Sequence, residues 1–143
     1  MESLLEADRC RIRERIETYC YSLDARDFAL TEACFTPEAQ IVHRSGAQVF
    51  AGPRELSASL VGFLTKYRST IHALSNIHVE DDRGVVRVRY SALVTLAPLD
   101  GASVIVRGVR YDDEMVRSGD DWVISRRFHD PLWQYVATTE QLT

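Results

Sequence analysis

The hydrophobic pattern of the chain changes from a helical period to a strand period at Tyr67, and this change restricts the fold more than any other feature. Four later segments alternate as extended strands do, namely residues 69–80, 84–99, 103–117 and 121–132. They are separated by the turn sequences Asp81-Asp-Arg-Gly84, Leu99-Asp-Gly101 and Ser118-Gly-Asp-Asp121. The pattern predicts a meander of long antiparallel strands.

The residues before Tyr67 follow helical spacing instead. Apolar residues three, four and seven positions apart predict a first amphipathic helix over residues 4–23, with a stripe of Leu5, Ile12, Ile16, Tyr19 and Leu23. Asp27 is a candidate N-cap for a second short helix through Phe35, which Pro37 ends. A third helix is expected between Gly52 and Lys66, with Leu56, Leu60 and Phe63 on one face.

Two short strands are expected between the second and third helices. Residues 39–43 and 48–51 read as a hairpin with a turn at residues 44–46. Helices followed by a long meander predict an α+β fold, a cone-shaped barrel in which a curved antiparallel sheet packs against the N-terminal helices. Because 143 residues suffice for one compact core, residues 1–143 are expected to form a single domain. The cavity inside such a cone is the natural place for a small ligand.

Charge and hydropathy argue against nucleic-acid and membrane partners. The net charge is -4 and the pI is about 5.5, whereas phosphate binding needs a concentrated cationic face. The chain has no apolar run long enough to cross a bilayer, and its N-terminus lacks the order of a signal peptide. A soluble, cytoplasmic protein is expected. Cys10, Cys20 and Cys34 lack CxxC spacing and are expected to be buried thiols.

The first long strand carries the candidate catalytic residue, His72. Simple alternation puts His72, Leu74, Asn76 and His78 on one face, and neither face of this strand is cleanly apolar. A lone strand histidine is more often structural, so its interpretation depends on a partner, for which Asp24 at the end of the first helix is the candidate. The alternative for Asp24 is a helix-end cap. The next strand is simpler, because Val86, Val88, Tyr90, Ala92 and Val94 alternate as core residues.

The order of elements and the motifs resemble the SnoaL-like, or nuclear-transport-factor-2-like, superfamily over nearly the whole chain. The motifs are most similar to a branch with scytalone dehydratase, hexachlorocyclohexane dehydrochlorinase and bile-acid dehydratase. The resemblance implies an Asp–His dyad of Asp24, in Ser22-Leu-Asp-Ala-Arg-Asp-Phe28, and His72, in Thr70-Ile-His-Ala-Leu-Ser-Asn76. It also assigns catalytic roles to Arg127, which follows Trp122 of the last strand, and to Tyr19.

The sequence departs from that branch at positions that bear on substrate. Scytalone dehydratase has a tyrosine where Leu23 stands, a second histidine near Val109 and another tyrosine at His43. Scytalone itself is therefore not expected as the substrate. Alternation would also place Arg126, not Arg127, on the face of Trp122, so the assignment of Arg127 requires a bulge.

The residue types predict proton abstraction. A neutral imidazole held by a carboxylate is an effective base near neutral pH, and Arg127 or Tyr19 would stabilise charge on the substrate or leaving group. The expected enzyme is a lyase or isomerase acting on a small hydrophobic cyclic or polyketide-like molecule, with no metal or organic cofactor. His72 and His78 lie about 20 Å apart along a strand, too far to share a metal ion.

Alternatives remain open at this stage. The same fold could serve as a non-catalytic ligand-binding or assembly module, or as a polyketide cyclase. Tyr19 could be stripe packing, and Arg127 could be an exposed strand charge. His43 and Asn76 are candidate substrate-binding residues, although His43 could face solvent and Asn76 could serve a strand bend. Residues 131–139 could close the cone mouth, with Trp133 facing substrate. A homodimer or homotrimer is expected.

Overall fold

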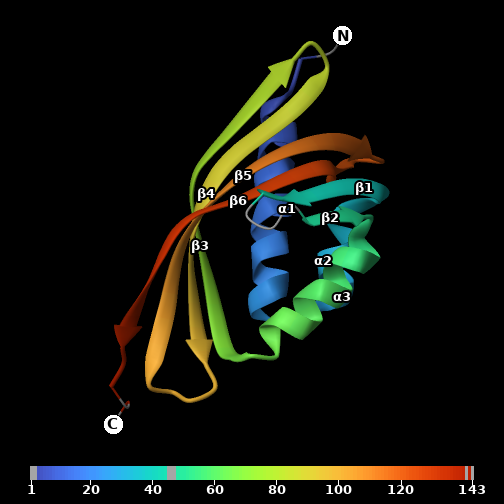
Figure 1. Ribbon diagram of the computed structural model, residues 1–143. Coiled ribbons are helices and arrows are strands. Elements are labelled where there is room, and N and C mark those ends of the chain that lie inside the picture. Colours follow the sequence, from blue (N-terminus) through green and yellow to red (C-terminus); the bar gives the residue numbers. More distant parts are fainter. Residues whose placement is uncertain (1–2, 45–47, 141, 143) are drawn as a thin grey trace.

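Six strands and three helices make up the part of the chain that the computed structural model describes, which is residues 3–44, 48–140 and 142 (Figure 1). The helices are α1 (Glu6–Asp24), α2 (Phe28–Ala33) and α3 (Pro53–Leu64). The strands are β1 (Phe35–His43), β2 (Gln48–Ala51), β3 (Tyr67–Asp82), β4 (Val85–Pro98), β5 (Ser103–Ser118) and β6 (Asp121–Thr138). The predicted α+β order is confirmed.

The strands form one curved, unclosed sheet in the order β2-β1-β6-β5-β4-β3 (Figure 1). The meander from β3 to β6 is antiparallel throughout, as predicted, and β1 and β2 form the predicted hairpin. The hairpin joins the meander through a parallel pairing of β1 with β6, which the sequence did not indicate. A parallel pair is possible here because a long connection separates the two strands.

Helix α1 lies along the concave side of the sheet and supplies much of the core (Figure 1). Its predicted stripe is confirmed at Ile12, Ile16, Tyr19 and Leu23, all of which are buried. Leu5 departs from the prediction, because it is the N-cap residue of α1 and is 66% exposed. The alternating residues of β4 face the same core, from Val86 to Val94, as their sequence period predicted.

The second helix is shorter than predicted, because β1 begins at Phe35. The Asp27 side chain caps α2 as expected, accepting a hydrogen bond from the backbone N–H of Leu30 at 3.1 Å. Pro37 lies inside β1, where the pairing with β6 is irregular between Phe35 and Gln40. Proline has no backbone N–H to donate to a regular ladder, and it is tolerated here because the pairing is irregular. The predicted turn at residues 44–46 lies, except for Arg44, outside the described residues.

The last strand is longer than predicted and includes the segment expected to close the cone mouth. β6 continues to Thr138 and pairs with β5 as far as Ser103. Residues 131–138 therefore extend the sheet. The free thiols of Cys20 and Cys34 are buried as predicted, whereas Cys10 is exposed on α1, contrary to the prediction.

None of the helices in the described part of the chain is both long and apolar enough to cross a membrane.

Gly52, which precedes α3, has a conformation that only glycine adopts readily. Its φ is 85° and its ψ is 166°, and a Cβ atom at this position would lie 2.7 Å from the backbone oxygen of Pro37. We expect Gly52→Ala to lower the free energy of unfolding by about 2 kcal/mol or more, measured by urea denaturation.

Gly119→Ala is the matched control, because Gly119 also has a positive φ, 63°, but open space around it. It should cost only about 1 kcal/mol, the ordinary cost of a left-handed alanine. Equal losses in the two variants would show that the contact with Pro37 has no role.

Candidate active site

Asp24 and His72 meet between the end of α1 and the first half of β3. The Nδ1 atom of His72 lies 2.6 Å from Oδ1 of Asp24, and the backbone N–H of His72 donates to Oδ2 at 2.9 Å. The hydroxyl of Thr70 donates to Oδ1 at 3.0 Å. The carboxylate thus accepts three hydrogen bonds from one strand, which fixes its orientation toward His72.

Asp24 does not act as a helix cap. It is the last residue of α1, and Ala25 is the C-cap. A carboxylate at a helix C-terminus opposes the helix dipole, so this position needs compensation. Arg26 supplies part of it, donating to the carbonyl of Leu23 at 2.6 Å and to the hydroxyl of Thr70 at 2.8 Å.

The hydrogen bonds to Asp24 keep it ionised. Burial acts to raise its pKa, but the bonds from the side chain and backbone of His72 outweigh burial, and the pKa of Asp24 is lowered. An ionised Asp24 assigns the Nδ1 proton to His72. The lone pair of His72 is then on Nε2, which is the arrangement a general base needs.

His72 lines a cavity of about 300 Å³ between α1, α3 and the concave side of the sheet. The His72 side chain is only 6% exposed, so water has little access to it outside the cavity. Apolar side chains from α1, α3, β4 and β5 form much of the wall. The polar side chains of the wall are those of Tyr19, His43, Gln48, Ser59, His72, Arg107, Tyr111 and His129. The cavity suits a small molecule that has both an apolar body and polar groups.

Arg127, and not Arg126, faces the interior. The pairing of β5 with β6 shifts between Met115–Ile124 and Glu114–Arg126, so β6 contains one extra residue there. This bulge reverses the alternation, which leaves Arg127 1% exposed and Arg126 on the outer face. The bulge that the assignment of Arg127 required is therefore present.

Arg127 lies in a buried ion pair beside the cavity. Its Nε and Nη2 atoms donate to Asp113 at 2.8 and 2.7 Å, and Nη2 also donates to the hydroxyl of Tyr90 at 2.6 Å. Burial alone would lower the pKa of Arg127, but the charge of Asp113 raises it well above the usual range. The guanidinium therefore stays charged and paired.

The rings of Tyr19 and Tyr111 contact both Arg127 and the cavity. The guanidinium carbon lies 4.0 Å from the ring centroid of Tyr19 and 4.9 Å from that of Tyr111, and both tyrosines line the cavity. Arg127 itself is not among the lining residues. The structure thus places Arg127 behind the wall, where it supports Tyr19 and Tyr111, and not at the surface that a ligand would touch.

Tyr19 lines the cavity as a protonated phenol. Burial raises its pKa to about 12, against the opposing charge of Arg127. At neutral pH its hydroxyl can donate a hydrogen bond but cannot act as a base.

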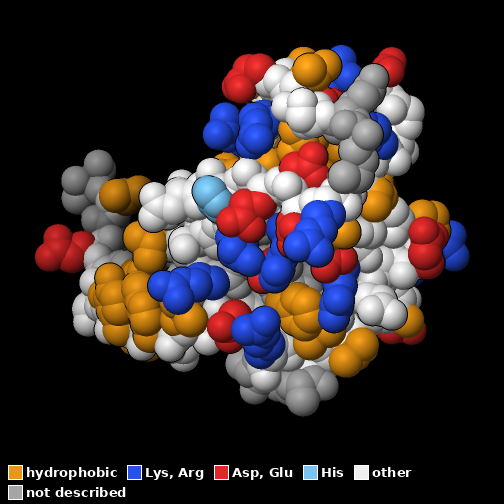
Figure 2. Space-filling view, turned by 90° about the horizontal axis from the view of Figure 1, so that it is seen from above, with side chains coloured by type: hydrophobic (Ala, Val, Ile, Leu, Met, Phe, Trp, Pro, Cys, Tyr) orange, Lys and Arg blue, Asp and Glu red, His pale blue; other side chains and the backbone are white. Residues whose placement is uncertain are grey.

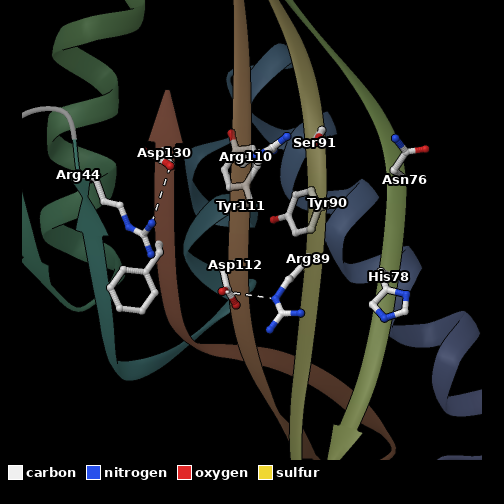
Figure 3. A pocket seen from close by; sticks show the side chains of 11 residues that line it. Arg44, Asn76, His78, Arg89, Tyr90, Ser91, Arg110, Tyr111, Asp112 and Asp130 are labelled. Atoms are coloured by element: carbon white, nitrogen blue, oxygen red, sulfur yellow. Dashed lines mark ion pairs between the residues drawn. The ribbon is translucent and has the colours of Figure 1, made fainter. Parts of the chain in front are cut away.

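Asn76 lies away from the cavity, which corrects its predicted position. The pairing of β3 with β4 shifts between Ser75 and His78, and Asn76 has a φ of 55° at this bend. The predicted shared face therefore ends at Leu74. Asn76 and His78 line a hollow of about 450 Å³ on the outer face of the sheet, beside Arg89 and Asp112 (Figure 3).

Charges of both signs cover the outside of the molecule near this hollow. Arg44 pairs with Asp130 at 3.7 Å, and Arg89 pairs with Asp112 at 3.7 Å (Figure 3). The face seen from above likewise shows basic and acidic side chains interspersed (Figure 2). This mixture differs from the single-sign surface to which phosphate backbones are attracted.

Trp133 also lies outside the cavity, contrary to the prediction. It is 50% exposed, and its ring stacks on Tyr135 with centroids 6.2 Å apart. The ring covers Gly108 of the neighbouring strand, where a Cβ atom would lie 2.5 Å from Trp133. Pro131, earlier in the same strand, does line the cavity.

His43 lines the cavity, next to His129, which sequence reasoning assigned no site role. The two residues are register partners in the parallel pairing of β1 with β6, and their rings stack with centroids 4.2 Å apart. Desolvation, with the charge of Arg127, lowers the pKa of His43 to about 4, and desolvation, with His43 and Arg127, lowers that of His129 to about 2. Nothing in the sequence indicated that His129 lies beside His43, because no local pattern predicts the pairing of β1 with β6.

No cluster of three or more His, Cys, Asp and Glu side chains is placed to hold a metal ion among residues 3–44, 48–140 and 142. In the dyad, Nδ1 of His72 already makes a hydrogen bond with Asp24. The groups that the cavity offers to a ligand are therefore imidazole, phenol, amide, hydroxyl and guanidinium side chains.

A curved sheet packed on helices, with a cavity between them and the Asp24–His72 pair at its wall, is the architecture of a class of small α+β proteins with a ligand-sized cavity. Residues 6–128 match the SnoaL-like domain family, and the chain belongs to this family. The resemblance inferred from the sequence is confirmed.

The chain is also similar to individual proteins of known sequence or structure. An uncharacterised protein of Mycobacterium tuberculosis strain H37Rv is 27% identical over 132 residues, which cover 90% of this chain and 88% of that protein. The structure is similar to a candidate scytalone dehydratase from Novosphingobium aromaticivorans, with a TM-score of 0.81 and 20% identity over 89% of this chain and 85% of that one. It is also similar to hexachlorocyclohexane dehydrochlorinase LinA-type3 from Novosphingobium barchaimii LL02, with a TM-score of 0.82 and 17% identity over 96% and 94% of the chains. At these identities the two structures show a shared fold.

Loss of Arg127 should destabilise the protein strongly. Arg127→Met leaves the fully buried Asp113 without its partner, so we expect a loss of about 3–5 kcal/mol in the free energy of unfolding. The double variant Arg127→Met, Asp113→Leu should recover much of this loss, because it leaves no unpaired charge. Urea denaturation measures both.

Arg87→Met is the control for the ion pair, because Arg87 pairs with Asp112 at 2.7 Å on the outer face. It should change the free energy of unfolding by only about 0–1 kcal/mol. A loss of that size for Arg127→Met would contradict the importance of the buried pair.

The two cavity histidines should make the fold sensitive to acid. The folded-state pKa values of His43 and His129, about 4 and about 2, lie below the unfolded value of 6.5. The unfolded chain therefore binds more protons, and stability falls as the pH drops from about 6.5 toward 4 for His43 and on toward 2 for His129. Each histidine should contribute up to about 1.4 kcal/mol per pH unit.

The measurement is the free energy of unfolding of wild type, His43→Phe and His129→Phe at several pH values below 7. Each substitution should reduce the acid slope, whereas His78→Phe, at an exposed site on the outer face, should not. If the free energy of unfolding falls with pH as steeply in both cavity variants as in wild type, the two histidines are not the source of the acid sensitivity.

Proposed function

We propose that the protein is a cofactor-independent lyase or isomerase of the dehydratase kind, acting on a small hydrophobic molecule that is cyclic or polyketide-like. The observation that carries the proposal is the Asp24–His72 pair, with 2.6 Å between Oδ1 and Nδ1, at the wall of a cavity lined by both polar and apolar side chains. The shared fold of the dehydrochlorinase and the candidate scytalone dehydratase supports it.

In the proposed reaction, His72 removes a proton from a carbon of the substrate. Its Nε2 lone pair takes the proton, and the electrons of the broken C–H bond form a carbon–carbon double bond. In an elimination, the leaving group departs with the electrons of its own bond. In an isomerisation, the imidazolium returns the proton to another carbon. Ionised Asp24 stabilises the imidazolium in both cases.

Tyr19 is the proposed donor to the leaving group. Its phenol stays protonated at neutral pH, since burial raises its pKa to about 12. It can donate a hydrogen bond or a proton to an oxygen that leaves the substrate. Arg127, which stacks on the Tyr19 ring and does not line the cavity, is proposed as a positioning residue.

A non-catalytic binding module is the competing function. A cavity with both apolar and polar side chains would serve that role as well, and the fold alone does not decide between the two functions. The hydrogen bonds on Asp24 favour the enzyme, because a binding site has no need to keep a buried imidazole in the tautomer that has a free Nε2 lone pair. A polyketide cyclase would use the same base.

Proton exchange tests the base without knowledge of the natural substrate. α-Tetralone is a bicyclic ketone, and abstraction of its C2 proton in D₂O is followed by ¹H NMR. We expect wild type to accelerate exchange, and His72→Ala to lose about 10² to 10⁴-fold of the rate. Asp24→Asn should also lose activity, because the amide cannot hold the imidazolium.

His78→Ala is the control, since His78 lies on the same strand but on the outer face. It should exchange the ketone at the wild-type rate. If His72→Ala exchanges as fast as wild type, His72 is not the base. If the ketone binds but wild type never exchanges it, the binding-module function is favoured.

A further inference from the structure

We propose that His43 and His129 form an oxygen-binding pair in the cavity, in which His129 donates a hydrogen bond to a carbonyl oxygen of the substrate. The inference rests on the proposed function, because it names the class of molecule on which the His72 base would act, a ketone. It assigns His129 as a substrate-binding residue and His43 as its positioning partner.

The pair is held by the backbone. His43 and His129 are register partners on adjacent strands β1 and β6, so their side chains leave the same face of the sheet. Their rings stack at 4.2 Å with 28° between planes. Phe50 contacts His43 edge-on at 5.2 Å, and Tyr111 contacts His129 edge-on at 5.2 Å. Aromatic neighbours on both sides thus restrict the rings, and both histidines line the cavity.

The environment of His129 assigns its tautomer. Its Nδ1 atom is buried and has no hydrogen-bond partner in the described part of the chain. An N–H group left unpaired in the interior is rarer than an unpaired acceptor, so Nδ1 is the nitrogen without a proton. Nε2 then carries the proton and is the atom left to donate into the cavity.

This tautomer is the reverse of that of His72. In His72 the proton is on Nδ1, which bonds Asp24, and Nε2 is an acceptor. The cavity thus contains a proton acceptor at β3 and a hydrogen-bond donor at β6. Abstraction of a proton next to a carbonyl uses this combination, because the electrons of the C–H bond form a carbon–carbon double bond and the π electrons of the carbonyl move to its oxygen, where the hydrogen-bond donor stabilises them.

The charge state of the pair agrees with this role. Desolvation and the nearby Arg127 lower the pKa of both histidines, so both stay neutral at physiological pH. A neutral donor holds the oxygen without giving up its proton. The positive charges of Arg107 and Arg127, both of which act on His129, favour the negative charge that develops on the oxygen.

Two probes of the same shape test the inference. α-Tetralone carries a ketone oxygen, and tetralin is the same bicyclic molecule without it. Their dissociation constants are measured by NMR titration for wild type and variants, and the ratio of the tetralin constant to the tetralone constant reports the oxygen contact. We expect His129→Phe, which keeps an aromatic ring but removes both nitrogens, to lower this ratio roughly fivefold, the effect of one neutral hydrogen bond.

Three further variants separate this contact from other effects. His129→Gln places an amide donor near the position of Nε2 and should retain most of the ratio. His78→Phe, on the outer face, should leave it unchanged. His72→Ala should also leave the ratio unchanged while it removes proton exchange, which separates oxygen binding from the base.

A wild-type ratio in His129→Phe would overturn the inference, whatever the exchange assay shows. Binding of neither probe up to its solubility would overturn it as well. If His129→Phe does not fold, the ¹⁵N signals of histidine-labelled wild type decide, because tetralone but not tetralin should shift Nε2 of His129. A preserved ketone preference without any exchange would support the oxygen contact and contradict the proposed lyase or isomerase activity.

Discussion

The buried ion pair of Arg127 and Asp113 is the interaction on which the arrangement of the cavity depends. The pair joins β6 to β5, and Arg127 is 1% exposed and Asp113 0% exposed. Arg127 also donates a hydrogen bond to the hydroxyl of Tyr90 on β4. The guanidinium then supports the rings of Tyr19 on α1 and Tyr111 on β5. Two charges at this depth are stable only as a pair, so the concave side of three strands and one helix is organised around it.

The polar groups of the cavity differ in state because their surroundings differ. His72 is held by an ionised carboxylate, whereas His43 and His129 are desolvated and influenced by nearby positive charge. Tyr19, buried against Arg127, remains a phenol. One cavity can therefore present an acceptor and several donors at the same pH, which is the usual requirement for moving a proton without a cofactor.

Local sequence patterns predicted the elements well and the site in part. The core residues of β4 and the cap at Asp27 follow from local period and capping preference. The meeting of Asp24 with His72 was implied by the resemblance to the SnoaL-like family. Asn76 and Trp133 were misplaced, since a register shift in β3 turns Asn76 to the outer face and β6 continues past the expected strand end. His129 was not identified, because its neighbour His43 is far away in the chain and close only through the pairing of β1 with β6.

By itself, the sequence determined the order of helices and strands and most of the apolar faces, because these depend on residue type and on spacing along one segment. The two segments of the dyad were recognised in the sequence through the family resemblance. Only the tertiary structure decided which of Arg126 and Arg127 turns inward, where Asn76 points and which histidines share a wall. One extra residue in a strand exchanges its two faces, and the parallel pairing joins segments that no local period connects. The groups around the dyad were therefore set by register, which is a property of the folded sheet.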